Sequence, residues 1–232
     1  LYTGTGKQYY RDCTIIGQTD YIFGNTGTSC IFDNCELQWL GYTGSNSKAG
    51  YITASRGRYL FRGCSVTSNK EAGYQVTPGY FGRPWGTASD VKMIGTAITE
   101  GTINADGWYQ MSGVTPEDVI FREYGNYIIN PENRKDQSKF FYSSYAQENK
   151  AFRLGRTEAE GLAESAADGQ YLGSWVPLHL IETALDLSGV AGWNEAETEK
   201  SWKFTYFGPS TSSAINTYSA PDKLAADTVM NS

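Results

Sequence analysis

Apolar and polar residues alternate in short blocks along the first half of the chain, and these blocks recur. Each copy runs from a large apolar residue through a small or polar one to Cys or Thr, and then to an aliphatic residue. The copies are Tyr10–Ile15, Phe32–Leu37, Phe61–Val66 and Met93–Ile98. Their Cys or Thr positions are 22, 29 and 32 residues apart. Blocks this short predict strands, and repeats of this length predict a solenoid.

The steps between the copies are too short and too rich in Gly for the crossover helices of alternating α/β folds. We therefore expect an all-β fold, a right-handed parallel β-helix in which each coil stacks on the one before. Residues one repeat apart then lie on neighbouring strands about 4.8 Å from each other.

The chain has four cysteines, all within its first 64 residues: Cys13, Cys30, Cys35 and Cys64. Their spacing is not that of a paired CxxC zinc site. Because Cys13 and Cys35 are one coil apart, they can form a disulfide, which would indicate an oxidising compartment. The alternative is an inward ladder of buried thiols continued by Cys64 and Thr96. Spacing leaves both open.

The repeat is no longer recognisable beyond residue 126. Residues 157–167 are rich in Ala and Glu and predict a short helix, and residues 181–187 predict a second. We expect these helices and their loops to pack on the solenoid, in one domain over residues 1–187. Residues 188–232 have few regularly spaced apolar positions and predict a capping strand or two, followed by a linker or tail.

The composition argues against several classes of partner and site. Only 19% of residues are charged and the net charge is −6, with no basic stripe, so we expect no nucleic-acid partner. No window approaches the roughly 18 apolar residues of a membrane helix, and we expect no membrane partner. The single histidine, His179, excludes His-cluster metal sites and makes any Ser–His–Asp triad depend on that residue. We expect carboxylate chemistry without a metal or other cofactor.

Three segments combine charged and aromatic residues in a Gly- or Pro-rich frame. They are Gly17–Asn25, Tyr80–Gly86 and Gly107–Gln110. Asp20 directly precedes an apolar strand-like triplet, where an aspartate lowers strand propensity. Taken singly, each segment has a structural explanation: Asp20 as a turn carboxylate, Arg83 as a surface ion pair, and Trp85 and Trp108 as core residues.

Taken together, these segments resemble the pectin methylesterases, or pectinesterases, which are right-handed parallel β-helices. The resemblance covers about the first 126 residues and follows the order of the family's motifs. The matching pieces are Gln8–Ile15, Asp20–Asn25, Phe32–Cys35, Ile52–Ala54, Gly82–Trp85 and Glu123–Asn126.

The resemblance implies hydrolysis of the methyl esters of galacturonate in pectin to carboxylates and methanol, by two aspartates and without metal. Asp20 matches the nucleophile, which attacks the ester carbonyl to form an acyl-enzyme. Arg83 matches the arginine that orients this aspartate, and Trp85 the tryptophan that packs on the sugar. Three more aromatic residues are expected to line the sugar groove: Phe23, Tyr2 and Trp108.

The family's general acid is an aspartate two residues before the position of Leu1, next to a glutamine that helps to form the oxyanion hole. We therefore expect the chain to be the C-terminal part of a larger enzyme, truncated at its N-terminal coils. Its partners would be methyl-esterified pectin and the missing N-terminal part, and alone it is expected to have little or no activity. Asp12 is no obvious substitute for the acid. Gln18 either adds an amide to the groove or, as we favour, faces solvent.

Two other functions compete with the esterase. A non-catalytic carbohydrate-binding β-helix keeps the aromatic groove without acid chemistry. A β-helical polysaccharide lyase needs clustered acids to bind Ca²⁺, and the sequence has no such cluster. The esterase interpretation also favours a secreted or cell-surface location.

Overall fold

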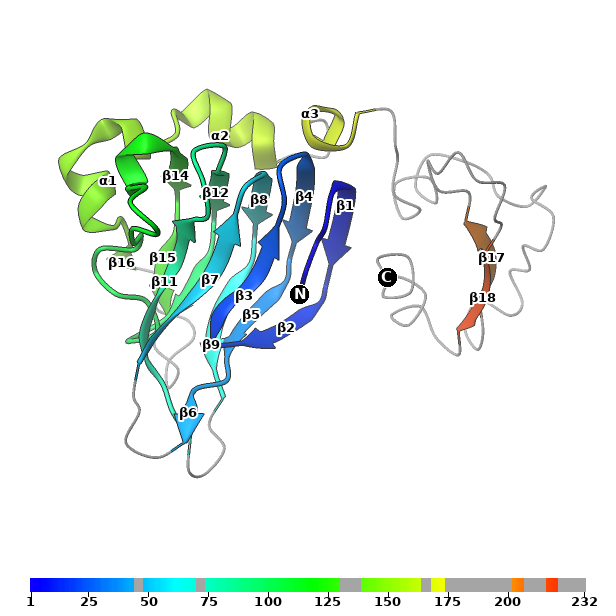
Figure 1. Ribbon diagram of the computed structural model, residues 1–232, viewed down its shortest axis with the longest axis horizontal. Helices are drawn as coiled ribbons and strands as arrows, with labels where there is room; N and C mark the ends of the chain where they lie inside the picture. Colours follow the sequence, from blue (N-terminus) through cyan, green and yellow to red (C-terminus); the bar gives the residue numbers. More distant parts are fainter. Residues whose placement is uncertain are drawn as a thin grey trace.

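The computed structural model describes residues 1–43, 48–69, 74–129, 139–163, 168–173, 202–206 and 216–220. Over the first 129 residues the chain winds into a parallel β-solenoid of about four turns. Figure 1 shows the strands stacked side by side along the long axis, from β1 to β14. The predicted fold class, a parallel β-helix, is confirmed.

The strands of the solenoid form three sheets, and only the first three turns contribute a strand to the third sheet. The first sheet contains β1 (Gly6–Arg11), β4 (Thr28–Asp33), β8 (Arg58–Arg62), β12 (Asp90–Ile94) and β14 (Ile120–Tyr124), all parallel. The second contains β2 (Thr14–Gly17), β5 (Glu36–Trp39), β9 (Ser65–Ser68), β13 (Ala97–Thr99), β15 (Tyr127–Ile129) and an antiparallel β16 (Lys139–Phe140). The third contains β3 (Thr19–Gly24), β7 (Ala49–Ser55) and β11 (Thr77–Pro84). A short antiparallel pair joins β6 (Tyr42–Thr43) to β10 (Tyr74–Gln75).

The small or polar position of the repeat is explained by the turn between the first two sheets. In five successive coils the residue there has φ between 53° and 64°: Asp12, Asn34, Gly63, Gly95 and Gly125. Only Gly, Asn and Asp adopt this left-handed conformation readily, because other side chains clash with the backbone. The sequence repeat thus follows from a backbone requirement of the turn.

The next position in each coil forms an inward ladder of Cys13, Cys35, Cys64, Thr96 and Asn126. All four cysteines are free thiols in this structure, and the ladder is present. A Cys13–Cys35 disulfide in an oxidising compartment stays a prediction. Cys30 lies outside the ladder, in β4. At the other end, the Asn126 side-chain oxygen accepts a hydrogen bond from the Thr96 backbone N–H at 2.9 Å.

Aromatic rings stack along the core at the first position of the repeat. Tyr10, Phe32 and Phe61 lie face to face, with ring centroids 4.8 and 4.5 Å apart. Met93 continues the same register, and Glu123 occupies it in the next coil. The core of the solenoid therefore ends on a buried carboxylate.

Helix α1 (Ser144–Glu148) and the 3₁₀ turn at Lys150–Phe152 pack against the main core through Ala146 and Phe152, and another 3₁₀ turn lies at Pro116–Asp118. Helices α2 (Arg156–Ala163) and α3 (Asp168–Leu172) cover the outer face of the first sheet, along one side of the stack (Figure 1). Outward residues of four strands pack against this cover: Tyr9, Ile31, Leu60 and Ile94, under Leu154, Ala159, Leu162, Tyr171 and Leu172. The helix predicted over residues 157–167 is present as α2 up to Ala163, whereas α1 and α3 were not predicted.

The helix predicted at 181–187, and His179, lie outside the described residues. In the region predicted as a cap and tail, β17 (Trp202–Tyr206) pairs antiparallel with β18 (Asn216–Ala220). The division at residue 187 stays a prediction. Within the described part of the chain, no helix is both long and apolar enough to cross a membrane.

A buried arginine ties α3 to the solenoid. Arg62 donates to Asp33 and to Asp168, each at 2.8 Å, and only 7% of its side chain is exposed. Replacing Arg62 by methionine leaves the buried Asp168 carboxylate without this partner, so we expect a loss of about 3–5 kcal/mol in the free energy of unfolding, measured in urea. Arg156→Met, in an exposed pair with Glu160, is the control and should cost less than about 1 kcal/mol. Equal losses in the two variants would contradict this account of Arg62.

Candidate active site

Asp20 lies at an irregularity in β3. Thr19 pairs with Tyr51 of β7 and Ile22 pairs with Thr53, so the two residues between Thr19 and Ile22 face a single residue of β7. Asp20 itself has φ of 51°, in the left-handed region that non-Gly residues rarely adopt. Such bulges turn a side chain out of the regular strand pattern and recur beside active sites. The low strand propensity of an aspartate at this position is thus accommodated by a local break in the strand.

Arg83 of β11 reaches across β7 to Asp20 and forms a bidentate pair. Its Nε donates to one carboxylate oxygen at 2.8 Å, and its Nη2 donates to the other at 2.5 Å. Both side chains remain about one-fifth exposed, so a ligand can reach the carboxylate. Hydrogen bonding to Asp20 raises the pKa of Arg83, and the two planar groups fix each other's orientation. The predicted partnership of Asp20 and Arg83 is present in the structure.

Gly82, which precedes Arg83, lies too close to β7 for any side chain. A Cβ at this position would lie 1.9 Å from the Thr53 hydroxyl oxygen. The glycine therefore allows β11 to pack against β7 at the level from which Arg83 extends. This is the physical reason for a glycine at the start of the Gly-Arg-Pro-Trp segment.

Three of the predicted groove residues form a row beside this pair. The rings of Tyr2 and Phe23 stack at 5.0 Å, and Phe23 meets Trp85 edge to face at 6.2 Å. Arg56, which the sequence did not single out, lies over the Trp85 ring at 4.4 Å and donates to the Trp85 carbonyl at 2.9 Å. The row offers flat apolar faces of the kind that pack on pyranose rings.

The prediction that Trp108 lines the groove is wrong. Only 1% of Trp108 is exposed, and its ring stacks on Phe121 at 4.2 Å inside the core. Its indole N–H donates to the Glu123 carboxylate at 2.8 Å. The next residue, Tyr109, is 40% exposed instead, and its backbone N–H donates to the Gly82 carbonyl at 3.0 Å.

Tyr109 belongs to a cluster of three tyrosines that the sequence analysis did not connect. Tyr51 stacks on Tyr80 at 5.4 Å, and Tyr109 packs on both at 5.6 and 5.1 Å. The Arg83 guanidinium carbon lies 3.9 Å from the centre of the Tyr51 ring. Tyr51 directly precedes the Ile-Thr-Ala segment, and nothing else in the sequence marks it.

Glu123 is fully buried beside Trp108. It accepts hydrogen bonds from Trp108 and from both the backbone N–H and the hydroxyl of Ser143, at 3.1 and 2.5 Å. Burial raises the pKa of Glu123, and these hydrogen bonds oppose the shift without cancelling it. The folded protein therefore binds the Glu123 proton more tightly than the unfolded chain does.

This shift predicts a pH effect on stability. As pH rises from about 4.5, the usual glutamate value, through the raised pKa, deprotonation costs the folded state more than the unfolded chain. The free energy of unfolding of Glu123→Gln, relative to wild type, is therefore expected to increase with pH across this window. Urea denaturation at several pH values measures it, with Glu117→Gln as the control for the change in net charge. Parallel Glu123→Gln and wild-type curves would refute the prediction.

Gln18 does not face solvent as expected. It is 8% exposed, and its side-chain oxygen accepts a hydrogen bond from the Gly41 backbone N–H at 2.7 Å, so it holds the loop after β5. Its role is thus structural. In the described part of the chain, no three His, Cys, Asp or Glu side chains converge in a way that could hold a metal ion.

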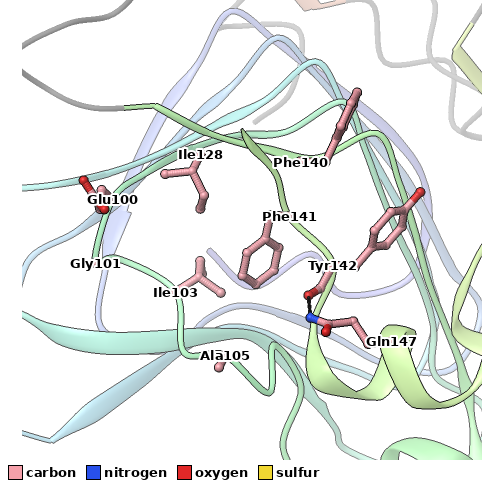
Figure 2. A pocket seen from close by; sticks show the side chains of 9 residues that line it. All are labelled: Glu100, Gly101, Ile103, Ala105, Ile128, Phe140, Phe141, Tyr142 and Gln147. Atoms are coloured by element: carbon pink, nitrogen blue, oxygen red, sulfur yellow. Dashed lines mark hydrogen bonds between the residues drawn. The ribbon is translucent and has the colours of Figure 1, made fainter. Parts of the chain in front are cut away.

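A separate cavity of about 310 Å³ lies at the far end of the solenoid. Figure 2 shows Ile103, Ile128 and Phe141 turned toward one another, with Glu100 and Tyr142 at the rim. Gln147 of α1 donates to the Tyr142 carbonyl at 2.6 Å. Asp20, Arg83 and the aromatic row do not line this cavity, so it is distinct from the candidate site.

The sequence was compared with models of known protein families and with known proteins. The family model described as Pectinesterase matches residues 1–152. Probable pectinesterase A of Neosartorya fischeri is 36% identical over 135 residues, which are 54% of this chain and 37% of that protein.

Solved structures similar to this chain are pectin methylesterases. A pectin methylesterase from Aspergillus niger is 25% identical with a TM-score of 0.50, over 74% of this chain and 51% of that one. A pectin methylesterase solved in complex with a hexasaccharide has the same fold, with 23% identity and a TM-score of 0.53, over 76% of this chain and 53% of that one. The chain thus spans about one-third to one-half of the length of these relatives. The match of the Pectinesterase model to well over half of the residues shows that the chain belongs to the pectinesterase family.

Proposed function

We propose that this chain carries the nucleophile and part of the substrate groove of an enzyme that hydrolyses methyl esters of galacturonate in pectin. The observation that carries the proposal is the bidentate Asp20–Arg83 pair beside the aromatic row, in a chain of the pectinesterase family. An accessible carboxylate with a fixed orientation, next to flat apolar faces, suits attack on an ester carried by a sugar ring.

In the proposed reaction, an oxygen of the Asp20 carboxylate bonds to the ester carbonyl carbon. The C–O bond to the methoxy group then breaks, and methanol leaves with a proton from a general acid. Water adds to the resulting anhydride, the bond to Asp20 breaks, and the galacturonate carboxylate is released with two protons, one of which returns to the general acid. Arg83 holds Asp20 in the attacking orientation throughout.

The resemblance assigns the general acid to an aspartate that precedes Leu1 in the family. The edge of the third sheet supports this assignment, because Leu1 lies along β3 with its carbonyl bonded to the Phe23 N–H at 3.0 Å. A residue joined to Leu1 would therefore lie near Asp20. This acid, and the neighbouring oxyanion glutamine, remain proposals.

Tyr2, Phe23 and Trp85 are proposed to bind the sugar faces. The relative solved with a hexasaccharide supports an oligosaccharide ligand for this fold. A secreted or cell-surface location is proposed because pectin is a cell-wall polymer. Plant and fungal pectinesterases are among the relatives of this chain, which supports that location.

Methanol release from highly methylated pectin tests the proposal. It is measured with this chain and with the longest natural polypeptide that contains it, because the chain spans only part of its relatives. We expect methanol at least from the longer form, and no unsaturated sugar ends. Pectin binding with no methanol from either form would overturn the esterase in favour of the carbohydrate-binding alternative. Unsaturated ends would favour a lyase.

A further inference from the structure

The Arg83 side chain must cross an intervening strand to reach Asp20. Asp20 is on β3 and Arg83 is on β11, and β7 lies between them. Arg83 pairs in register with Ala54, whereas Tyr51, three residues earlier on β7, pairs with Thr19 next to Asp20. Because a strand advances about 3.3 Å per residue, the arginine must run diagonally over the surface of β7.

The Arg83 guanidinium lies over the ring of Tyr51 in β7. The 3.9 Å from the guanidinium carbon to the ring centre is the shortest arginine–ring distance among the described residues. An arginine otherwise has many side-chain conformations, and stacking on a ring restricts the plane of its guanidinium.

The Tyr51 ring is itself held in place. It stacks on Tyr80 with an angle of 15° between the ring planes, and Tyr109 packs against both rings. Burial raises the pKa of Tyr51, so its phenol stays neutral and adds no second negative charge beside Asp20. The ring therefore gives Arg83 a rigid, uncharged support.

We propose that Tyr51 is a positioning residue for catalysis, which sets the plane of the Arg83 guanidinium and thereby the orientation of the Asp20 carboxylate. The bidentate pair keeps carboxylate and guanidinium nearly coplanar, so a tilt of one is passed to the other. The oxygen that attacks the ester is thus oriented by a ring that does not touch it. This inference rests on the proposed function for its effect on rate, but not for its effect on Arg83.

The test compares Tyr51→Leu, which removes the flat face, with Tyr51→Phe, which keeps it. Tyr109→Leu is the matched control, because Tyr109 belongs to the same cluster but its ring contacts are with Tyr51 and Tyr80. If Tyr51→Leu does not fold, Tyr51→Thr takes its place, since threonine suits a strand. The first readout is the NMR signal of the Arg83 Nε–H, assigned by its loss in Arg83→Lys. The second is the kcat and KM of methanol release.

We expect Tyr51→Leu to shift the Arg83 Nε–H signal and speed its exchange with solvent, while Tyr51→Phe leaves it in place and Tyr109→Leu, which removes only one of the two rings that support Tyr51, has a clearly smaller effect. The kcat of Tyr51→Leu should fall by about 10- to 100-fold with a smaller change in KM, the scale expected for a misplaced catalytic group. An unchanged Nε–H signal in Tyr51→Leu, or equal effects in Tyr51→Leu and Tyr109→Leu, would overturn the inference. Failure of wild type to release methanol would instead refute the proposed function, and the NMR readout would still decide the role of Tyr51.

Discussion

Replacing Asp20 by asparagine is expected to lower the kcat of methanol release by about 10⁴-fold or more, the scale seen when a nucleophile is removed. The amide lacks the negative charge that attacks the ester carbonyl. The backbone should tolerate the change, because asparagine is among the few residues that adopt the left-handed conformation seen at Asp20 (φ 51°). The loss should therefore appear in rate and not in folding. Steady-state methanol release and a urea denaturation curve measure the two effects.

Asp12→Asn is the matched control for this variant. Asp12 has φ of 54°, and an asparagine already occupies the equivalent turn one coil later, at Asn34. The two variants make the same chemical change in the same backbone conformation, but Asp12 lies in the turn after β1, away from Arg83. We expect Asp12→Asn to keep the wild-type rate. A similar loss in both variants would show that Asp20 is not the nucleophile.

The second large effect is expected for Arg83→Lys. Lysine keeps the positive charge but cannot donate two parallel hydrogen bonds to one carboxylate. If orientation of Asp20 is what Arg83 supplies, kcat should fall by about 10²- to 10³-fold, the scale for loss of one preorganised hydrogen-bond donor at an active site.

Arg56→Lys provides the comparison for this second variant. Arg56 also lies over an aromatic ring, that of Trp85, but it donates a hydrogen bond to a backbone carbonyl and not to Asp20. Its replacement should affect KM more than kcat, because Trp85 belongs to the sugar-binding row. A wild-type kcat in Arg83→Lys would mean that charge alone suffices and would remove the argument for a bidentate pair.

The solenoid was predictable because a single physical requirement limits the residue types at each position of the repeat. The small or polar position is a left-handed turn, which Asp12, Asn34 and Gly63 all satisfy. The aromatic position is a stacked core column that begins at Tyr10. Requirements of this kind recur in every coil, so one sequence displays them several times.

The site was only partly predictable, because its residues do not repeat. Trp108 and Tyr109 are adjacent aromatics, and the sequence does not show which of them turns inward. The choice depends on Glu123, a buried acceptor for an indole N–H that lies 15 residues further on. Tyr51 was missed because its role depends on the diagonal path of Arg83 over β7, which only the register of three strands defines. Spacing likewise could not separate a disulfide from the thiol ladder.

The most direct test of the central claim is to trap the acyl-enzyme. The active form is incubated with methyl-esterified pectin and hydroxylamine, and the peptide that contains Asp20 is examined by mass spectrometry. Hydroxylamine cleaves the mixed anhydride at either carbonyl, so the account predicts a hydroxamate on Asp20, on the galacturonate carboxyl, or on both, with esterified pectin and not with fully demethylated pectin. A hydroxamate on another carboxylate of the protein, or methanol release with no hydroxamate on either Asp20 or galacturonate, would contradict it.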